Sequence, residues 1–171
     1  NLPIPEEVQY AAEHALNRRL RREIEELAKN GFDEGKLPSV YRVIEIAKQF
    51  RVTLKGAHIA PILNEELAQR TRELAKEVNK QRIRQCFLIQ EVARRMNVEL
   101  DKHLPQDDVF FLLKKWSEQS ENALGISEET MERIFELAVS LGINPDEFRK
   151  GWLRHRDKAA GERKGSAGVT R

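Results

Sequence analysis

The sequence has little of what stabilises small folds covalently or marks a sheet. Its one cysteine, Cys86, excludes an intramolecular disulfide framework and a cysteine-cluster metal site. We expect this thiol to be buried and structural. The 171 residues include only 9 glycines and 6 prolines, and aromatic residues make up 6%. Because no alternating run of β-branched residues is present, a sheet-based fold is not predicted.

Long hydrophobic runs are also missing. The longest, residues 109–113, is far too short to cross a bilayer, and no signal-peptide pattern opens the chain. Hydrophobic residues make up 40% and charged residues 34%, a balance typical of a folded helical protein with a highly charged surface. The sequence therefore predicts a soluble cytoplasmic protein with no membrane contact.

The patterns that usually mark a catalytic or metal site are absent. The histidines are widely separated along the chain: His14, His58, His103 and His155. None has a Glu three residues before it, and no His-x-x-x-His pair occurs. No glycine-rich phosphate loop follows a strand. We interpret His58 as a packed or boundary histidine. The sequence thus predicts no enzymatic activity, no metal and no cofactor.

Apolar residues recur every three or four positions along most of the chain, as in amphipathic helices. This periodicity predicts an all-α fold, a bundle of about six to seven helices that includes one long central helix. That long helix spans 64–96, with Asn79 as the expected site of a bend. Before it, Thr53 is expected to cap a short helix that Pro61 ends or kinks. Residues 101–106 are expected to form a loop, and residues 109–113 with Trp116 to lie in the core.

Helix-end signals place the other helices. Gly31 is expected to end a first helix that begins at about Glu6, and a second helix runs from Pro38 or Ser39 to Phe50. Ser127 and Gly142 are expected to bound a later helix. Asn144, followed by proline and two acids, is the sharpest helix-start signal in the chain.

The chain is predicted to form a single helical domain over 1–158, with a subdivision near 100–106 as the alternative. Residues 159–171 are rich in glycine and charge. They contain too few apolar residues to offset the entropy of ordering them, so they are expected to form a disordered basic tail.

A short pattern occurs three times: an alanine, an apolar residue three positions later, and another two further on. The alanines are Ala47, Ala93 and Ala138, spaced by 46 and 45 residues (93 − 47 and 138 − 93). Each copy is typical of a tight helix exit. The spacing indicates either stacked helical-hairpin repeats or a chance recurrence of ordinary helix ends.

The same pattern is the first half of a helix-turn-helix. Pro61 and Pro105 interrupt the helix that should follow the first two copies. Only the third copy leads into an unbroken helix, and there Asp146 and Glu147 stand where phosphate would approach. An ordinary helical hairpin is the favoured interpretation.

Basic residues cluster locally, although lysine and arginine outnumber acids by only 30 to 28. Four arginines between 18 and 22 are followed by three glutamates, so we interpret them as a solvated charged face. The stretch 76–95 is the better phosphate candidate because only Glu77 and Glu91 oppose it. The candidate nucleic-acid-binding residues are Lys80, Arg82, Arg84, Arg94, Arg95, Arg149, Lys150, Arg154 and Arg156.

These clusters predict a nucleic-acid-associated accessory or regulatory protein that binds the phosphate backbone through arginines, without catalysis. The alternative is a helical protein–protein interaction adaptor that makes no nucleic-acid contact. The expected partner is accordingly DNA or RNA in the first case and another protein in the second. A homodimer formed through the long helix is compatible with both.

Overall fold

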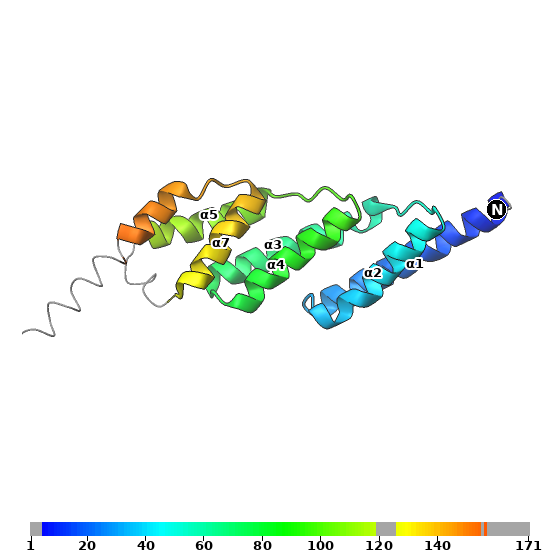
Figure 1. Cartoon of the computed structure of the whole chain (residues 1–171), viewed down its shortest axis with the longest axis horizontal. Coiled ribbons are helices and arrows are strands. Elements are labelled where there is room, and N and C mark those ends of the chain that lie inside the picture. The colour runs from blue at the N-terminus through cyan, green and yellow to red at the C-terminus, as the bar shows by residue number, and fades with distance from the viewer. Residues whose placement is uncertain (1–4, 119–125, 155, 157–171) are drawn as a thin grey trace, which may run out of the picture. The chain divides into compact units, whose positions relative to one another are not determined.

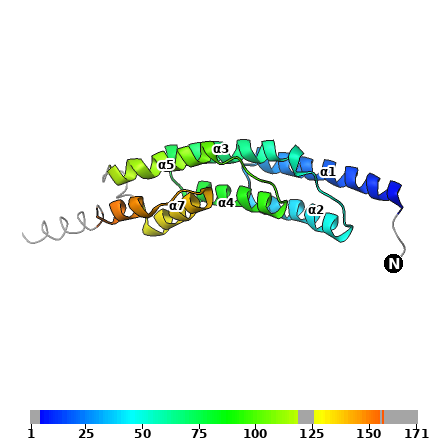
Figure 2. The same cartoon turned by 90° about the horizontal axis from the view of Figure 1, so that it is seen from above.

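The computed structural model describes residues 5–118, 126–154 and 156, whose elements are drawn in Figures 1 and 2. Every regular element in these residues is helical, which confirms the predicted all-α class and multi-helix architecture. None of the described helices combines the length and apolar character needed to cross a bilayer. The predicted tail, 159–171, lies outside the described residues.

The chain divides into two compact units. Unit 1 comprises Asn1–Arg70 and Arg84–Asp101, and unit 2 comprises Thr71–Ile83 and Lys102–Arg171. One division point, between Asp101 and Lys102, falls within the 100–106 segment. The other two lie inside helices, so the chain passes between the units three times.

In unit 1, α1 (Glu6–Lys29) and α2 (Leu37–Gln49) form a hairpin through the short 3-10 helix η1 (Glu34–Lys36) (Figure 1). The apolar stripe of α1 is buried only in its C-terminal half, at Leu20, Ile24 and Leu27. Nearer the N-terminus, Val8 and Tyr10 are 55% and 74% exposed. The first half of α1 therefore presents side chains that packing does not cover.

The predicted long helix 64–96 is wrong, because the chain forms two helices there, α3 (Ala60–Lys76) and α4 (Lys80–Arg95). The break lies at Asn79, where only a bend was expected. The Asn79 side-chain oxygen accepts the Arg82 backbone N–H at 2.9 Å, and the Arg82 guanidinium donates to the carbonyl of Glu77 at 2.6 Å. These contacts satisfy backbone groups that the two helix ends leave unpaired.

The start of α3 also differs from the prediction. Instead of a helix capped by Thr53, the chain forms the 3-10 helix η2 (Gly56–His58), and Pro61 then stands in the first turn of α3. Proline is well tolerated there because the first N–H groups of a helix have no intrahelical partner. Asn64 does not start the helix. Its side chain accepts the Asp101 backbone N–H at 2.9 Å, which joins α3 to the segment after α4.

Unit 2 contains α5 (His103–Glu118), α7 (Glu128–Leu141) and a last helix over 146–154. The expected helix signals at Ser127, Gly142 and Asn144 are confirmed: Ser127 accepts the Thr130 N–H, Gly142 has φ 90°, and Asn144 accepts the Asp146 N–H. The loop after residue 101 is shorter than expected, since α5 begins at His103.

Most of the α5 residues that were expected in the core are buried. The buried side chains of unit 2 include Val109, Leu112, Leu113, Trp116, Met131, Ile134, Phe135, Leu137, Ala138, Leu141 and Trp152. Phe110 and Phe111, expected in the core, are instead 41% and 62% exposed. Cys86, in α4, is fully buried as expected.

The three copies of the alanine pattern form the same helix exit. The N–H of Val52, Val98 and Ile143 donates to the carbonyl of Ala47, Ala93 and Ala138 at 2.8, 2.9 and 2.8 Å. The residue before each donor is left-handed, with φ of 56°, 53° and 90°. This is the Schellman geometry. Because each copy ends the second helix of a pair, the 46- and 45-residue spacing marks one helical hairpin per period in the described chain.

Candidate anion-binding site

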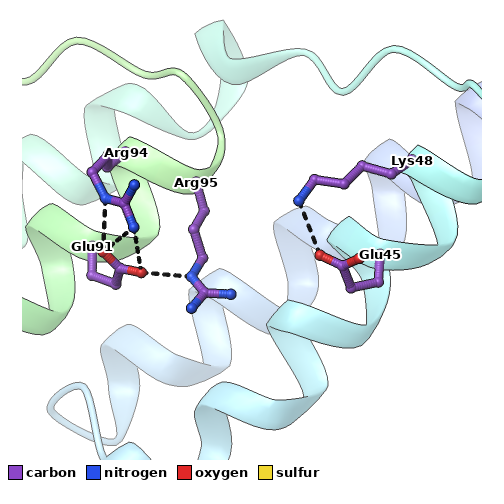
Figure 3. Close-up of polar contacts among 5 residues, drawn as sticks. All are labelled: Glu45, Lys48, Glu91, Arg94 and Arg95. Carbon is purple, nitrogen blue, oxygen red and sulfur yellow. Dashed lines mark hydrogen bonds and ion pairs between the residues drawn. The ribbon is translucent and has the colours of Figure 1, made fainter.

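Two of the predicted phosphate-binding arginines share one carboxylate. At the end of α4, Glu91 accepts hydrogen bonds from Arg94 Nε and Nη2, both at 2.9 Å, and from Arg95 Nε at 2.7 Å (Figure 3). Arg95 extends toward α2, where its guanidinium lies 4.0 Å from the centre of the Tyr41 ring. We call these four residues the Glu91 cluster. The anion that these two arginines bind is thus Glu91, a residue of the chain itself.

The pKa values of Glu91 and Tyr41 depart from their ordinary values. The hydrogen bond from Arg95, helped by that from Arg94, lowers the pKa of Glu91 below its ordinary 4.5. Burial raises the pKa of Tyr41 above its ordinary 10, and a tyrosine ring is neutral at physiological pH even at the ordinary value. A neutral ring with a cation on its face is a favourable arrangement.

The other predicted residues of α4 are also paired. In unit 1, Arg84 pairs with Glu34, and in unit 2, Lys80 pairs with Glu129. Arg82 pairs with Glu77 at 2.9 Å besides completing the end of α3. The acids of the first two pairs come from distant parts of the sequence, so counting neighbouring acids along the chain underestimates the pairing.

Most of the predicted cations of the last helix meet acids within unit 2. Arg149 pairs with Glu132 at 2.8 Å, Lys150 with Glu147 at 3.1 Å and Arg156 with Glu128 at 3.0 Å. Arg154 donates to the Lys150 carbonyl at 3.3 Å. Exposed ion pairs contribute only about 0.2–1 kcal/mol each, so they can open for a ligand. The carboxylates would nevertheless stay nearby and repel phosphate.

A different basic group lines a surface cavity of about 260 Å³ in unit 1. We call it the α1 pocket. Its lining residues are Tyr10, Glu13, His14, Asn17, Arg18, Arg21, Lys55, His58 and Ile59. One wall is α1 from Tyr10 to Arg21, and the other is the segment 55–59, which contains η2 and which we call the η2 segment. Five of the nine side chains carry basic nitrogen, and Glu13 is the one acid among them.

Helical spacing places the α1 wall. His14, Arg18 and Arg21 follow Tyr10 at intervals of four, four and three residues, so all four lie on one face of the helix. The opposite wall contributes Lys55 and His58, above the buried Ile59. His58, expected to be a packed or boundary histidine, is an exposed side chain that lines the cavity.

Asn17 ties the two walls together. Its amide nitrogen donates to the carbonyls of Glu13 and Thr53, at 2.8 and 3.1 Å, and its oxygen accepts the Lys55 backbone N–H at 2.6 Å. The Lys55 ammonium also pairs with Glu13 at 3.1 Å. These contacts fix the η2 segment against α1, so the cavity does not depend on exposed side chains alone.

The four arginines of α1 between residues 18 and 22 have different environments. Arg19 lies 3.7 Å from Glu23, and Arg21 pairs with Glu25 at 2.8 Å. Arg18 lines the cavity and pairs with no carboxylate of the described residues, and Arg22 is exposed outside the cavity. One face of this charged helix is therefore part of a built cavity, which the sequence interpretation as a solvated face did not anticipate.

The α1 pocket was missed because half of it comes from tertiary contacts. The helical spacing of Tyr10, His14, Arg18 and Arg21 is visible in the sequence, but the opposing Lys55 and His58 are not predictable from it. Glu13, His14 and His58 line the cavity, yet no group of three side chains placed to hold a metal ion occurs in the described part of the chain.

Scans of the chain against models of known protein families, curated proteins and solved structures find no match.

Proposed function

We propose that this protein is a non-catalytic accessory protein that binds single-stranded nucleic acid, with the α1 pocket as its main phosphate contact. The observation that carries the proposal is the convergence of five basic side chains, from two separate segments, around a cavity with an exposed aromatic ring at its edge. Each part of that arrangement has a matching part in a nucleotide.

The phosphate would bind to the arginines. A guanidinium presents planar, paired N–H donors that match phosphate oxygens, and such charge-assisted bonds are about twice as strong as neutral ones. Arg18 forms no ion pair with a carboxylate in the described part of the chain that a phosphate would have to displace. To bind a phosphate, Arg21 would give up its exposed ion pair with Glu25. Such a pair, between residues four positions apart on a helix, contributes only about 0.3–0.5 kcal/mol. Lys55, which pairs with Glu13 at 3.1 Å, is a third cation on the opposite wall.

The base would bind to Tyr10. Its ring is 74% exposed, and it lies one helical turn from His14 on the face that lines the cavity. Stacking of a base on an aromatic ring contributes about 1–3 kcal/mol and requires an unpaired base. A ring beside a phosphate site therefore favours a single strand over a duplex, whose bases are already stacked.

The basic residues predicted from the sequence would have a secondary role. Eight of the nine pair with acids within the described chain, so they offer a phosphate little net charge. We assign them a weak, sequence-independent attraction that adds to the α1 pocket.

One observation favours the alternative function of a protein–protein adaptor. In unit 2, α5 exposes Leu104, Phe110 and Phe111, and α7 exposes Val139. The Phe110 ring lies edge-on to those of Phe111 and Phe148, with centroids 5.9 and 5.5 Å apart. Exposed aromatic groups are enriched at protein interfaces, where an apolar helix of a partner could cover them.

Fluorescence anisotropy titrations of the full chain with single-stranded DNA, single-stranded RNA and duplex DNA test the proposal. We expect micromolar binding to the single strands at low salt and weaker binding to the duplex. Arg18→Glu should weaken it about tenfold or more, since a favourable charged contact becomes a repulsion. Arg22→Glu is the matched control, with the same charge change on the same helix outside the cavity, and should leave the affinity within about twofold.

Two results would contradict the proposal. Absence of binding to all three nucleic acids at low salt would reject it and leave the adaptor as the leading account. Equal losses in Arg18→Glu and Arg22→Glu would show that the charge of α1 matters and the pocket does not.

A further inference from the structure

The basic character of the α1 pocket does not continue along the helix. On the same face, Glu7 lies seven residues before His14, and Glu25 lies seven residues after Arg18. Seven residues are two helical turns, or about 10 Å. The first turn of α1 carries two acids, Glu6 and Glu7. Toward the other end of the helix, Glu23 pairs with Arg19, and Glu25 pairs with the cavity residue Arg21.

A strand that followed α1 in either direction would thus move from the cavity toward carboxylates. Nucleic-acid channels that hold internal phosphates instead offer a continuous basic groove. Here the charge is concentrated at one place, in a cavity of about 260 Å³, which is small for a ligand site. The geometry is that of a site for one phosphate group.

We propose that the α1 pocket recognises a terminal phosphate monoester, the phosphorylated end of a nucleic-acid strand, in preference to an internal phosphodiester. This inference rests on the proposed function and specifies its ligand. A phosphate monoester carries a charge of about −1.5 to −2 near pH 7 and three free oxygens. A phosphodiester carries one charge and two free oxygens.

The terminal group fits the donors on the two walls. Arg18 and Arg21 come from α1 and Lys55 from the η2 segment, so three cations can meet three oxygens from different sides. His14 and His58 add ring N–H donors at the same cavity. The base of the terminal nucleotide would stack on Tyr10, and the rest of the strand would leave the pocket away from Glu7 and Glu25.

The test compares three single-stranded oligonucleotides of one sequence and one internal fluorophore. One has a 5′-phosphate, one a 3′-phosphate, and one hydroxyl groups at both ends. Titrated with the full chain, a phosphorylated strand should bind about tenfold more tightly than the hydroxyl strand, because one charged contact group is gained. The 5′ and 3′ arms identify which end is read. Inorganic phosphate should compete with the phosphorylated strand.

A variant pair locates the effect. Arg18→Gln should remove the preference for the phosphorylated strand, whereas Arg22→Gln should keep it. Measurable but equal binding of all three oligonucleotides would overturn this inference and leave the proposed function standing, because internal phosphates would then account for the affinity. No binding of any oligonucleotide would overturn both.

Discussion

The α1 pocket and the Glu91 cluster both lie in unit 1, and each contains two arginines of a single helix, α1 for the pocket and α4 for the cluster. They differ in what lies between the cations. In the Glu91 cluster, one carboxylate accepts hydrogen bonds from Arg94 and Arg95 and takes the position that an anionic ligand would need (Figure 3). In the α1 pocket, the cations surround a cavity, and Glu13 pairs with Lys55 alone.

A high local density of cations therefore does not by itself make an anion site. The stretch around residues 82–95 has the stronger basic bias in the sequence, but its arginines are paired with acids: Arg82 with Glu77, Arg84 with Glu34, and Arg94 and Arg95 together with Glu91. The α1 stretch has more acids nearby in the sequence, but Arg18 lines the cavity and pairs with no carboxylate of the described residues. The arrangement of the charges therefore matters more than their number.

The largest effect should come from reversing two charges in the α1 pocket, and the comparison is the same reversal in the Glu91 cluster. Arg18→Glu with Arg21→Glu should weaken binding of a phosphorylated single strand by about a hundredfold, since two charged contacts are lost at about tenfold each. Arg94→Glu with Arg95→Glu, which makes the same change of charge, should weaken it by less than about threefold. Anisotropy titrations measure both, and equal losses would remove the distinction between the two places.

A smaller loss should follow from giving the α1 pocket a carboxylate of its own. His14→Glu places an acid four residues before Arg18, the same spacing that joins Glu91 to Arg95. The new carboxylate should pair with Arg18 and weaken strand binding by about tenfold. His103→Glu makes the same substitution in unit 2 and should have little effect. Unchanged affinity in His14→Glu would mean that Arg18 does not contact the ligand.

The converse change should open the Glu91 cluster. Glu91→Gln removes the carboxylate that holds Arg94 and Arg95, so the two arginines should attract phosphate and raise the affinity by about threefold. The unfolding free energy should fall by about 0.5–1 kcal/mol because exposed ion pairs contribute little. Glu45→Gln, which breaks only the pair with Lys48 at 3.0 Å, is the control (Figure 3). Affinity that falls in Glu91→Gln would contradict the comparison.

The smallest effect concerns stability in acid. The pKa of Glu91 is lowered in the folded chain by Arg95 and Arg94, that of Glu129 by Lys80 and that of Glu26 by Lys36. A carboxylate with a lowered folded pKa stabilises the fold above its unfolded pKa, here about 4.5, and this contribution is lost as the pH falls further. Urea unfolding should therefore show a constant free energy from pH 7 down to about 5 and a decline below 4.5.

The Glu91→Gln variant should show a shallower decline in acid than the parent chain. An identical decline would mean that the Glu91 cluster contributes nothing to stability.

Local sequence signals predicted much of the fold. The positions of Ser127, Gly142 and Gly31 defined helix ends because capping is decided by a few neighbouring residues. The helical reversal at Asn79 was predicted only as a bend, since periodicity continues through it and the stabilising contacts of Arg82 are not visible in the sequence. The position of Pro61 in its helix was wrongly predicted for a related reason. A proline can end a helix or stand in its first turn, and only the residues that pack around it decide which.

The candidate site was predictable only in part. The spacing of Tyr10, His14 and Arg18 already gives one face of a helix, but the cavity needs Lys55, brought across by the bonds of Asn17. The pairing of Lys80 with Glu129 is equally non-local. Sequence distance between charges thus indicates local pairs such as Arg21 with Glu25, but neither the non-local pairs nor the cations that surround a cavity.

The most direct test of the account is to map the bound ligand by NMR. Backbone and side-chain signals of the full chain would be followed during titration with a 5′-phosphorylated and a 3′-phosphorylated single strand. We expect the largest shifts at Tyr10, His14, Arg18, Lys55 and His58 with whichever end is bound, and small shifts at Arg94, Arg95 and the last helix. Shifts centred on the Glu91 cluster or on residues 149–154, with the α1 pocket unchanged, would contradict the account.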